Sequence, residues 1–423
     1  MAEEKRLAIL VGGGPAPGIN SVIGAATIRS ILGGFTVYGI HDGFETLMEG
    51  DQPNAELLTI DDVSRIHFRG GSILGTSRAN PTAEPRLLDN TIANLKRLQV
   101  SHLITIGGDD TAFSAMKVSQ RAGGEIKVVH VPKTIDNDLD LPAAIDTFGF
   151  QTARHVGAEL VKNIMTDAFT TSRWYFVVSM GRKAGHLALG IGKAAGATMT
   201  LIPEEFRGQQ VPLRLVVDTL AGSILKRLSY GRRHGVAVIA EGIALSIDER
   251  DLGSLESVER DAHGHVRIAE IDIADILKRA VRARLAELGV KTTIVAKDIG
   301  YELRCADPIP YDMEYTRDLG FCAARYILSG GSDAMVSMQG GRFVPIPFSE
   351  LIDPQTGRTR IRTVDIDSER YRIAHRYMIR IRREDFENPA ELERLAETAH
   401  MSVERFRREF EYITQFEPPP LDF

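Results

Sequence analysis

The chain has 423 residues, 43% of them hydrophobic, which is enough for roughly two or three domains with cores of their own. Its 51 basic and 57 acidic residues give a formal net charge of −6. Dedicated nucleic-acid-binding proteins usually carry a basic excess, so we expect no nucleic-acid partner.

No apolar run reaches the roughly 18 residues that a membrane-spanning helix requires, and the first residues contain no apolar core of a signal peptide. The two cysteines, Cys305 and Cys322, form no Cys-x-x-Cys motif, so we predict neither a zinc ribbon nor a redox motif. Two isolated cysteines are typical of reduced thiols in a cytosolic protein. We therefore expect a soluble cytoplasmic protein without a membrane partner.

Short apolar runs that are typical of buried strands recur along the chain, and several are followed by stretches with helical periodicity. We expect strands over residues 7–11, 35–40, 103–106, 128–131, 175–178 and 236–239, and a first helix that ends near residue 32. This alternation predicts a mostly parallel α/β sheet. In such sheets ligands bind beyond the carboxyl ends of the strands, and here the loops at those ends carry glycine, hydroxyl and charged residues.

A run of three glycines, Gly12 to Gly14, follows the first expected strand. Its main-chain N–H groups can approach a phosphate closely, although a structural turn explains the run equally well. No Lys-Ser or Lys-Thr pair follows at the spacing of a P-loop. A second glycine-rich stretch, residues 190–195, resembles a dinucleotide-binding fingerprint but has no preceding strand, so we interpret it as close helix packing.

Two adjacent carboxylates, Asp109 and Asp110, follow the strand expected over residues 103–106. Neighbouring like charges are unfavourable without a cation. Mg²⁺ commonly binds one or two carboxylates together with substrate phosphates. A helix N-cap explains one of the two acids but not both, so these residues indicate a magnesium site.

The next strand runs into Lys133, Thr134 and Asp136. Asp136 can accept the proton of an attacking hydroxyl group, and Lys133 can neutralise charge on a transferring phosphoryl group. Phosphoryl transfer needs these parts together with a donor-binding loop and a metal. The alternative interpretation is a surface turn in which the aspartate and asparagine side chains cap the main chain.

Three arginines near strand ends or in loops, Arg173, Arg182 and Arg304, have the fork geometry that suits phosphate oxygens. A single arginine of this kind is more often part of a surface ion pair. Glu241 can bind sugar hydroxyl groups or serve as a structural hydrogen-bond acceptor.

The C-terminal part is rich in arginine, but acidic residues are interleaved with it, which favours a solvated or interface surface over a nucleic-acid patch. Asn388 followed by Pro389 has the pattern of a helix N-cap with proline at the first helical position. We expect one amphipathic helix over residues 391–413.

Four of these segments together resemble the phosphofructokinase A family: Gly-Gly-Asp-Asp-Thr at 107–111, Pro-Lys-Thr-Ile-Asp-Asn-Asp at 132–138, Met-Gly-Arg at 180–182 and the run 301–312. The resemblance covers about residues 7–345 in the same order. It implies two similar Rossmann-like α/β lobes with mostly parallel sheets, an active site in the cleft between them and a C-terminal helical extension. The donor and magnesium lobe would comprise residues 1–147 with about 303–345, the fructose 6-phosphate lobe 148–302 and the extension 346–423.

The resemblance also implies a role for each matched residue. The donor-binding set would be Gly13, Arg78, Gly108 and Asp110, with Asp109 as the Mg²⁺ ligand. Asp136 would act as the base on the 1-hydroxyl group of the sugar, and Lys133, Asp110 and Arg182 would complete the catalytic set. The residues that would contact fructose 6-phosphate are Thr134, Ile135, Asp136, Arg173, Met180, Gly181, Arg182, Glu241, Tyr301, Glu302, Leu303 and Arg304.

Two departures from the ATP-using members of that family bear on the phosphoryl donor. Those members carry glycine where this chain has Asp110 and glycine where it has Lys133. Asp110 would place a side chain and a negative charge where the α-phosphate of a nucleotide would lie. The Asp–Lys pair is the mark of the pyrophosphate-dependent branch, so we expect transfer from pyrophosphate to fructose 6-phosphate, with the ATP-dependent reaction as the alternative.

Two further alternatives belong to other classes. Lipid and NAD kinases share a Gly-Gly-Asp motif, but the sugar-binding motifs between residues 180 and 304 argue against them. A sugar-phosphate sensor without activity would not need Asp109, Lys133 and Asp136. The resemblance places Arg173 across a subunit interface, which implies a homo-oligomer and favours a dimer.

Overall fold

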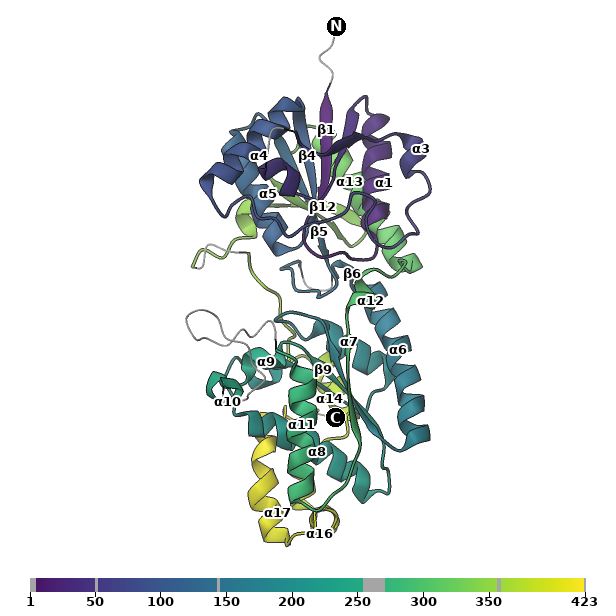
Figure 1. Ribbon diagram of the computed structural model, residues 1–423, viewed down its shortest axis with the longest axis vertical. Coiled ribbons are helices and arrows are strands. Elements are labelled where there is room, and N and C mark those ends of the chain that lie inside the picture. The colour runs from purple at the N-terminus through teal and green to yellow at the C-terminus, as the bar shows by residue number, and fades with distance from the viewer. Residues whose placement is uncertain (1–4, 50–51, 143–144, 254–270, 356–358, 422–423) are drawn as a thin grey trace. The chain divides into compact units, whose positions relative to one another are not determined.

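The computed structural model describes residues 5–49, 52–142, 145–253, 271–355 and 359–421. The chain divides into two units, each of which alternates strands and helices (Figure 1). The first unit comprises Met1–Ala153 and Tyr301–Arg362, and the second comprises Arg154–Gly300 and Thr363–Phe423.

The strands of the first unit are β1 (Arg6–Val11), β2 (Thr36–Ile40), β3 (Ala55–Leu57), β4 (Val100–Gly107), β5 (Lys127–Thr134), β6 (Phe148–Gly149), β11 (Ala334–Gln339) and β12 (Arg342–Pro347). They form one sheet in the order β12-β11-β5-β4-β1-β2-β3, and β6 pairs with β5. All pairs are parallel except β11 with β12 and β2 with β3. The carboxyl ends of β1, β4 and β5 therefore meet at one edge of this sheet.

The helices of the first unit are α1 (Ile19–Ile31), α2 (Glu45–Met48), α3 (Ile60–Val63), α4 (Pro85–Arg97), α5 (Asp109–Ala122), α12 (Tyr301–Arg304), α13 (Pro310–Leu328) and the 3-10 helix η3 (Phe348–Glu350). Helices α1 and α13 pack against each other on one side of the sheet, and α4 and α5 lie on the other (Figure 1). Alternate residues of β1, Ala8 and Leu10, share a core with Ile92, Leu95 and Met116 of these latter helices.

The second unit has a parallel sheet in the order β10-β7-β9-β8, formed by β7 (Trp174–Ser179), β8 (Met199–Leu201), β9 (Gly235–Ala240) and β10 (Ile294–Ile299). Its helices are α6 (Phe150–Thr171), which starts in the first unit, α7 (His186–Ala195), η1 (Pro203–Phe206), α8 (Leu213–Ser229), α9 (Ile243–Ser246), α10 (Glu249–Gly253), α11 (Ile273–Glu287), α14 (Glu369–Tyr377), α15 (Arg383–Glu387), α16 (Pro389–Thr398), α17 (Val403–Phe410) and η4 (Glu411–Phe416).

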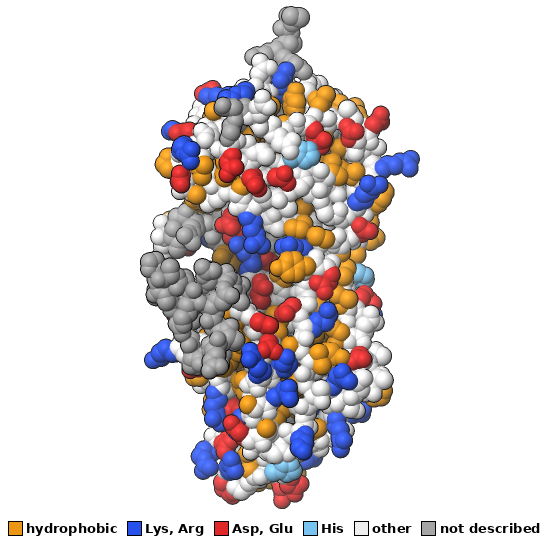
Figure 2. Space-filling view, in the orientation of Figure 1, with side chains coloured by type: hydrophobic (Ala, Val, Ile, Leu, Met, Phe, Trp, Pro, Cys, Tyr) orange, Lys and Arg blue, Asp and Glu red, His pale blue; other side chains and the backbone are white. Residues whose placement is uncertain are grey.

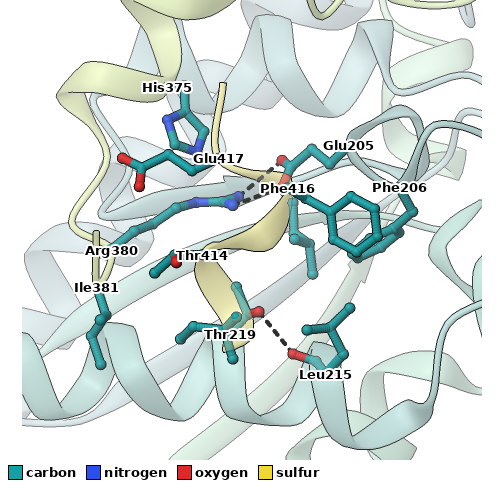
Figure 3. Close-up of a pocket in the computed structure, with 12 residues that line it drawn as sticks. Glu205, Phe206, Leu215, Thr219, His375, Arg380, Ile381, Thr414, Phe416 and Glu417 are labelled. Carbon is teal, nitrogen blue, oxygen red and sulfur yellow. Dashed lines mark hydrogen bonds and ion pairs between the residues drawn. The ribbon is translucent and has the colours of Figure 1, made fainter. Parts of the chain in front are cut away.

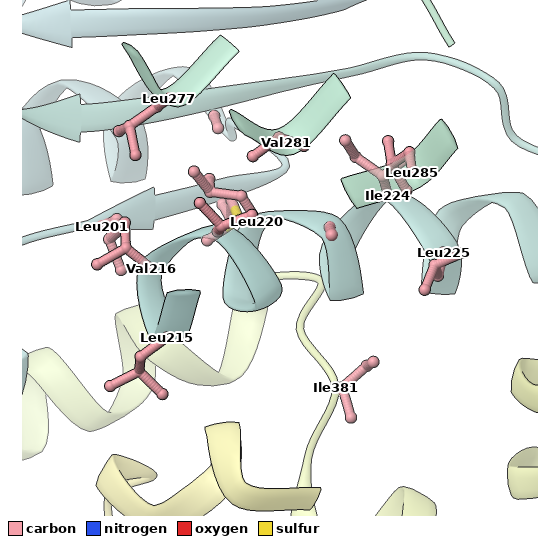
Figure 4. Packing of buried hydrophobic residues seen from close by; sticks show 14 of the residues in the cluster. Leu201, Leu215, Val216, Leu220, Ile224, Leu225, Leu277, Val281, Leu285 and Ile381 are labelled. Carbon is pink, nitrogen blue, oxygen red and sulfur yellow. The ribbon is translucent and has the colours of Figure 1, made fainter. Parts of the chain in front are cut away.

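The core of the second unit forms where α8 and α11 cover the sheet (Figure 4). Leu220 of α8 and Val281 of α11 are fully buried there. The C-terminal segment adds Ile381, Phe406 and Phe410 to the same core. The C-terminal residues from 363 onward are thus an integral part of this unit, whereas residues 346–362 belong to the first one.

The predicted strands over 7–11, 35–40, 103–106, 128–131, 175–178 and 236–239 correspond to β1, β2, β4, β5, β7 and β9, and the predicted parallel α/β fold is confirmed. Strand β5 extends to Thr134, so Lys133 belongs to the strand itself. Residues 190–195 lie within α7, where a Cβ atom at Gly192 would be 2.0 Å from Oγ1 of Thr200. That glycine stretch therefore reflects close packing, as predicted.

The prediction of one helix over residues 391–413 is wrong, because the chain forms α16 and α17 with a break between them. His400 has a left-handed φ of 54°. Ser402 then starts α17 by accepting a hydrogen bond from the N–H group of Arg405 at 3.3 Å. The predicted N-cap is confirmed, since Oδ1 of Asn388 accepts a hydrogen bond from the N–H group of Ala390 at 3.1 Å.

None of the helices in the described ranges combines the length and the apolar character that crossing a bilayer requires. On the face shown in Figure 2, basic and acidic side chains are interspersed. Cys305 is exposed, Cys322 is buried, and both are free thiols.

Candidate active site

The glycine run lies at the carboxyl end of β1 and is held by main-chain hydrogen bonds. The N–H group of Gly12 donates to the carbonyl of Ile106 at 2.8 Å, and that of Gly13 donates to the carbonyl of Ser77 at 2.7 Å. Gly13 has a φ of 82°, a conformation that favours glycine. These bonds join the run to the end of β4 and to the segment that carries Arg78, whose side chain is exposed.

Thr111 packs against two glycines at this edge of the sheet. A Cβ atom would be 2.5 Å from Oγ1 of Thr111 if it were added to Gly12, and 2.3 Å from Cβ of Thr111 if it were added to Gly107. The glycines thus allow the end of β1, the end of β4 and the start of α5 to approach one another closely. The motif at residues 107–111 contains Thr111, but its sequence pattern predicts no role for that residue.

Asp109 and Asp110 occupy the first turn of α5, directly after the N-cap residue Gly108. The positive end of the helix dipole stabilises carboxylates at this position. The side chain of Asp110 is exposed, whereas Asp109 is partly buried. The described residues contain no cluster of three or more His, Cys, Asp or Glu side chains that could hold a metal ion. A cation at this position would therefore take one or two carboxylates and complete its shell with phosphate oxygens and water, which is the mode typical of Mg²⁺.

Lys133 places its ammonium group at the glycine run. The side chain is only 4% exposed, and Nζ donates a hydrogen bond to the carbonyl of Gly14. A Cβ atom added to Gly13 would lie 3.5 Å from the same nitrogen. The glycine run after β1 and the lysine near the end of β5, which lie far apart in the sequence, therefore meet in the first unit.

His130 lies fully buried in β5, three residues before Lys133. Burial lowers the pKa of its imidazole to about 3, and the positive charge of Lys133 contributes. The imidazole is therefore neutral near pH 7, so Nε2 donates to the carbonyl of Gly107 at 3.0 Å and Nδ1 accepts from the hydroxyl group of Thr105 at 2.8 Å. His130 thus adds no second positive charge to the one on Lys133.

The loop after β5 begins with Thr134, Ile135 and Asp136. The N–H group of Asp136 donates to Oγ1 of Thr134 at 3.0 Å, which closes a tight turn. Asp136 is 6% exposed, and the side chain of Ile135 is 5% exposed. A ligand contact at Ile135 would therefore use the main chain.

The predicted sugar-binding residues 301–304 form the short helix α12. The guanidinium group of Arg304 lies 4.7 Å from the centre of the Tyr301 ring, and a Cβ atom at Gly14 would be 3.1 Å from its Nη1. Its Nε is buried and has no hydrogen-bond partner among the residues that the structure describes. An anionic ligand oxygen would satisfy this donor. Leu303 is fully buried, whereas Tyr301 and Glu302 are exposed.

The second unit brings together three of its predicted residues beyond the carboxyl ends of β7 and β9. Oε1 of Glu241 accepts hydrogen bonds from the N–H groups of Gly181 at 3.1 Å and Arg182 at 2.5 Å. Arg182 has a left-handed φ of 52°, and these bonds hold it there. Glu241 is thus a structural acceptor for this loop. Met180 follows β7 in the same loop, and its side chain packs against Gly300.

Arg173 is the one predicted residue of the second unit that lies apart from the others. It precedes β7, whereas Gly181 follows it. A strand of this length separates them by on the order of 20 Å. Its Nε is buried and has no hydrogen-bond partner in the described part of the chain. At the same end of the sheet, the amino ends of β8 and β9 border a cavity of about 490 Å³ lined by residues that include Phe169, Arg227 and His234.

A smaller cavity of about 30 Å³ lies in the second unit, beside the buried ion pair between Glu205 and Arg380 (Figure 3). It has room for about one water molecule. No predicted site residue lines it.

The sequence profile described as Phosphofructokinase matches residues 6–327. A pyrophosphate–fructose 6-phosphate 1-phosphotransferase from Thermotoga maritima is 56% identical over 420 residues, which cover 98% of this chain and 100% of that protein. A protein of the same name from Naegleria fowleri is 51% identical, with 97% of this chain and 96% of that protein covered.

A more distant relative, from Corynebacterium efficiens, is 34% identical over 82% of this chain and 93% of its own length, and it is named ATP-dependent 6-phosphofructokinase. A solved structure of a pyrophosphate-dependent phosphofructokinase from Nitrosospira multiformis matches with a TM-score of 0.65 at 17% identity, covering 100% of this chain and 94% of that chain. At this identity the structural match shows the fold alone.

Proposed function

The chain belongs to the phosphofructokinase family, and on that premise we propose that it transfers a phosphoryl group from pyrophosphate to the 1-hydroxyl group of fructose 6-phosphate. The products are fructose 1,6-bisphosphate and phosphate, and the reaction is reversible.

The position of Lys133 is the main support for pyrophosphate as the donor. Its ammonium group donates a hydrogen bond to the glycine run, and Asp110 lies in the first turn of α5. A cation at the run attracts a compact, highly charged donor. A carboxylate in the first turn of α5 would repel the inner phosphate of a nucleotide by charge and by volume. The relatives from Thermotoga maritima and Naegleria fowleri, at 56% and 51% identity, both carry the pyrophosphate name, which supports the same donor.

The proposed mechanism uses few protein groups, as is usual for phosphoryl transfer. Asp136 accepts the proton of the 1-hydroxyl group as its oxygen forms a bond to the terminal phosphorus of pyrophosphate. The bond from this phosphorus to the bridging oxygen breaks, and the leaving phosphate carries away the electron pair. Lys133 and Arg182 offset the negative charge that develops on the transferring group. The hydroxyl group of Thr134 accepts a hydrogen bond from the N–H group of Asp136, and the resulting turn orients Asp136.

Asp109 would hold the Mg²⁺ ion, with Gly13, Gly108 and Arg78 around the donor. When bound, this ion neutralises charge on the donor phosphates. For the sugar phosphate we propose Ile135, Met180, Gly181 and Glu241 together with residues 301–304, where Arg304 supplies a buried donor suited to a phosphate oxygen.

Arg173 would serve the sugar phosphate bound by a partner subunit, because it lies at the far end of β7 from Gly181 and Arg182. The proposed assembly is therefore a homodimer, and the proposed location is the cytoplasm.

A comparison of donors tests this proposal. Fructose 6-phosphate and Mg²⁺ are supplied with pyrophosphate or with ATP at equal concentration, and fructose 1,6-bisphosphate is measured through coupled aldolase. We expect product with pyrophosphate and little or none with ATP. Equal or faster turnover with ATP would assign the chain to the ATP-dependent reaction, and turnover with neither donor would contradict the proposed function.

A further inference from the structure

The loop that carries Asp136 continues into Asn137, which has a left-handed φ of 57°. For a residue other than glycine this conformation is uncommon and requires support from its surroundings. Asn137 is 5% exposed, so the support comes from within the protein. The direction in which the chain leaves Asp136, and hence the position of its carboxylate, depends on this turn.

The carboxamide of Asn137 makes hydrogen bonds to the other end of the same loop. Oδ1 accepts a hydrogen bond from the N–H group of Thr147 at 2.9 Å, and Nδ2 donates to Oδ1 of Asp146 at 3.0 Å. The hydroxyl group of Thr147 in turn donates to the carbonyl of Thr134 at 2.7 Å. The two ends of the loop are thereby tied together.

Arg362 binds both sides of this loop, although it lies more than two hundred residues further along the chain. Its Nε donates to the carbonyl of Asn137 at 3.1 Å, and its Nη1 donates to the carbonyl of Ile145 at 2.8 Å. A third nitrogen, Nη2, donates to Oδ1 of Asn137. The main-chain N–H group of Arg362 also donates to the carbonyl of Asp138 at 2.8 Å. One guanidinium group therefore bridges the two sides of the loop with three directed bonds.

The charges around Arg362 match this arrangement. Burial lowers the pKa of its guanidinium group, and the carboxylates of Asp146, Asp140 and Asp138 act in the opposite direction. Arginine stays protonated in proteins under all ordinary conditions, so the bridge does not depend on pH. A lysine here would keep the charge but could not form the same planar set of bonds.

We propose that Arg362 is a positioning residue for the catalytic base: it holds Asn137 in its left-handed turn and thereby sets Asp136 in line with the hydroxyl group to be deprotonated. This inference rests on the proposed function of Asp136. No sequence motif predicts this role, because Arg362 lies outside the matched motifs and in the C-terminal part of the chain.

The test compares Arg362→Ala and Arg362→Lys with Arg360→Ala. Arg360 lies two residues away on the same segment and pairs with Asp140 of the same loop at 3.8 Å, with about half of its side chain exposed. A misplacement of a catalytic group by about 1 Å costs on the order of 10²-fold in rate. For Arg362→Ala we expect kcat to fall by about 10- to 100-fold while KM for both substrates changes less than about threefold. Arg362→Lys should recover only part of this loss, and Arg360→Ala should stay close to wild type.

Two further measurements separate positioning from general destabilisation. Added guanidinium ion should restore part of the activity of Arg362→Ala and none of that of Asp136→Ala. The double variant Asn137→Ala with Arg362→Ala should lose little more than either single variant, because the two residues act through one turn.

Arg362→Ala with wild-type kcat would overturn the inference while leaving the proposed function intact. Loss of activity in proportion to a lowered melting temperature, without rescue by guanidinium, would overturn it as well. Should the wild-type protein show no transfer from pyrophosphate, the proposed function itself fails, and this outcome is seen before any variant is made.

Discussion

The ammonium group of Lys133 donates a hydrogen bond to the main-chain carbonyl of Gly14 across 119 residues of sequence. The bond joins the carboxyl end of β5 to the loop after β1, which is the place where a parallel sheet offers a phosphate site. It holds a positive charge at the glycine run. In the proposed function, the choice of phosphoryl donor depends on this charge.

The first prediction concerns the donor. Replacing both Asp110 and Lys133 by glycine should raise the rate with ATP at least about tenfold above wild type, because the change removes the charge and volume that oppose a nucleotide. The rate with pyrophosphate should fall in the same variant. Initial rates at saturating fructose 6-phosphate with each donor provide the measurement.

Lys127→Met is a matched control for Lys133→Met, because Lys127 belongs to the same strand and its Nζ donates to the carbonyl of Gly330 at 3.2 Å. Only the change at Lys133 should reduce transfer from pyrophosphate. A double glycine variant that gains no ATP-dependent activity at all would contradict the proposed basis of donor choice.

The second prediction concerns the base. Asp136→Ala should lower kcat by about 10² to 10⁴, the range that removal of an oriented general base typically costs. Asp140→Asn, an exposed carboxylate of the same loop, should leave kcat within about twofold of wild type. Steady-state rates with pyrophosphate check both, and near-wild-type turnover of Asp136→Ala would refute the assignment.

The third prediction concerns packing at the donor loop. Gly12→Ala should lower the free energy of unfolding by about 1–3 kcal/mol, since the new methyl group would lie 2.5 Å from Oγ1 of Thr111. Thr111→Ala removes both side-chain atoms that approach within 3 Å. The double variant should therefore be more stable than Gly12→Ala alone. Denaturant unfolding of the two single variants and the double variant gives the comparison, and strictly additive losses would argue against this contact.

The fourth prediction concerns acid stability. The pKa of His130 is about 3 in the folded chain, against an ordinary value of 6.5, because its burial disfavours the charged form. Between pH 3 and pH 6.5, the imidazole of His130 therefore binds a proton in the unfolded chain but not in the folded chain. The stability that the neutral imidazole contributes is fully present above pH 6.5 and is lost as the pH falls from 6.5 toward 3, by about 1.4 kcal/mol per pH unit.

His130→Gln should flatten the dependence of unfolding free energy on pH between 6.5 and 4.5, whatever its effect at neutral pH. His155→Gln, a change at an exposed histidine, should leave that slope as in wild type. An unchanged slope in His130→Gln would mean that the buried imidazole is not the group that titrates on unfolding.

Strand periodicity and the short motifs at strand ends are local properties. The sequence alone was therefore enough to predict β1, β4, β5, β7 and β9 as parallel strands, each followed by a polar loop. The break at His400 escaped prediction, because the residues on both sides continue the amphipathic pattern and only the left-handed turn with its Ser402 cap interrupts it. The sequence left two roles open for Glu241, sugar binding and structural acceptance, and only the fold showed that it accepts from the N–H groups of Gly181 and Arg182.

The sequence by itself determined the family, the parallel α/β architecture and the types of residue available for phosphoryl transfer, because motif spacing and hydrophobic periodicity are written along the chain. Only the tertiary structure decided which of these residues meet. Contacts such as that of Lys133 with Gly14 and that of Arg362 with Asn137 join segments 119 and 225 residues apart. Their geometry follows from how the sheet stacks its strands and where the C-terminal segment returns, and no local pattern encodes that.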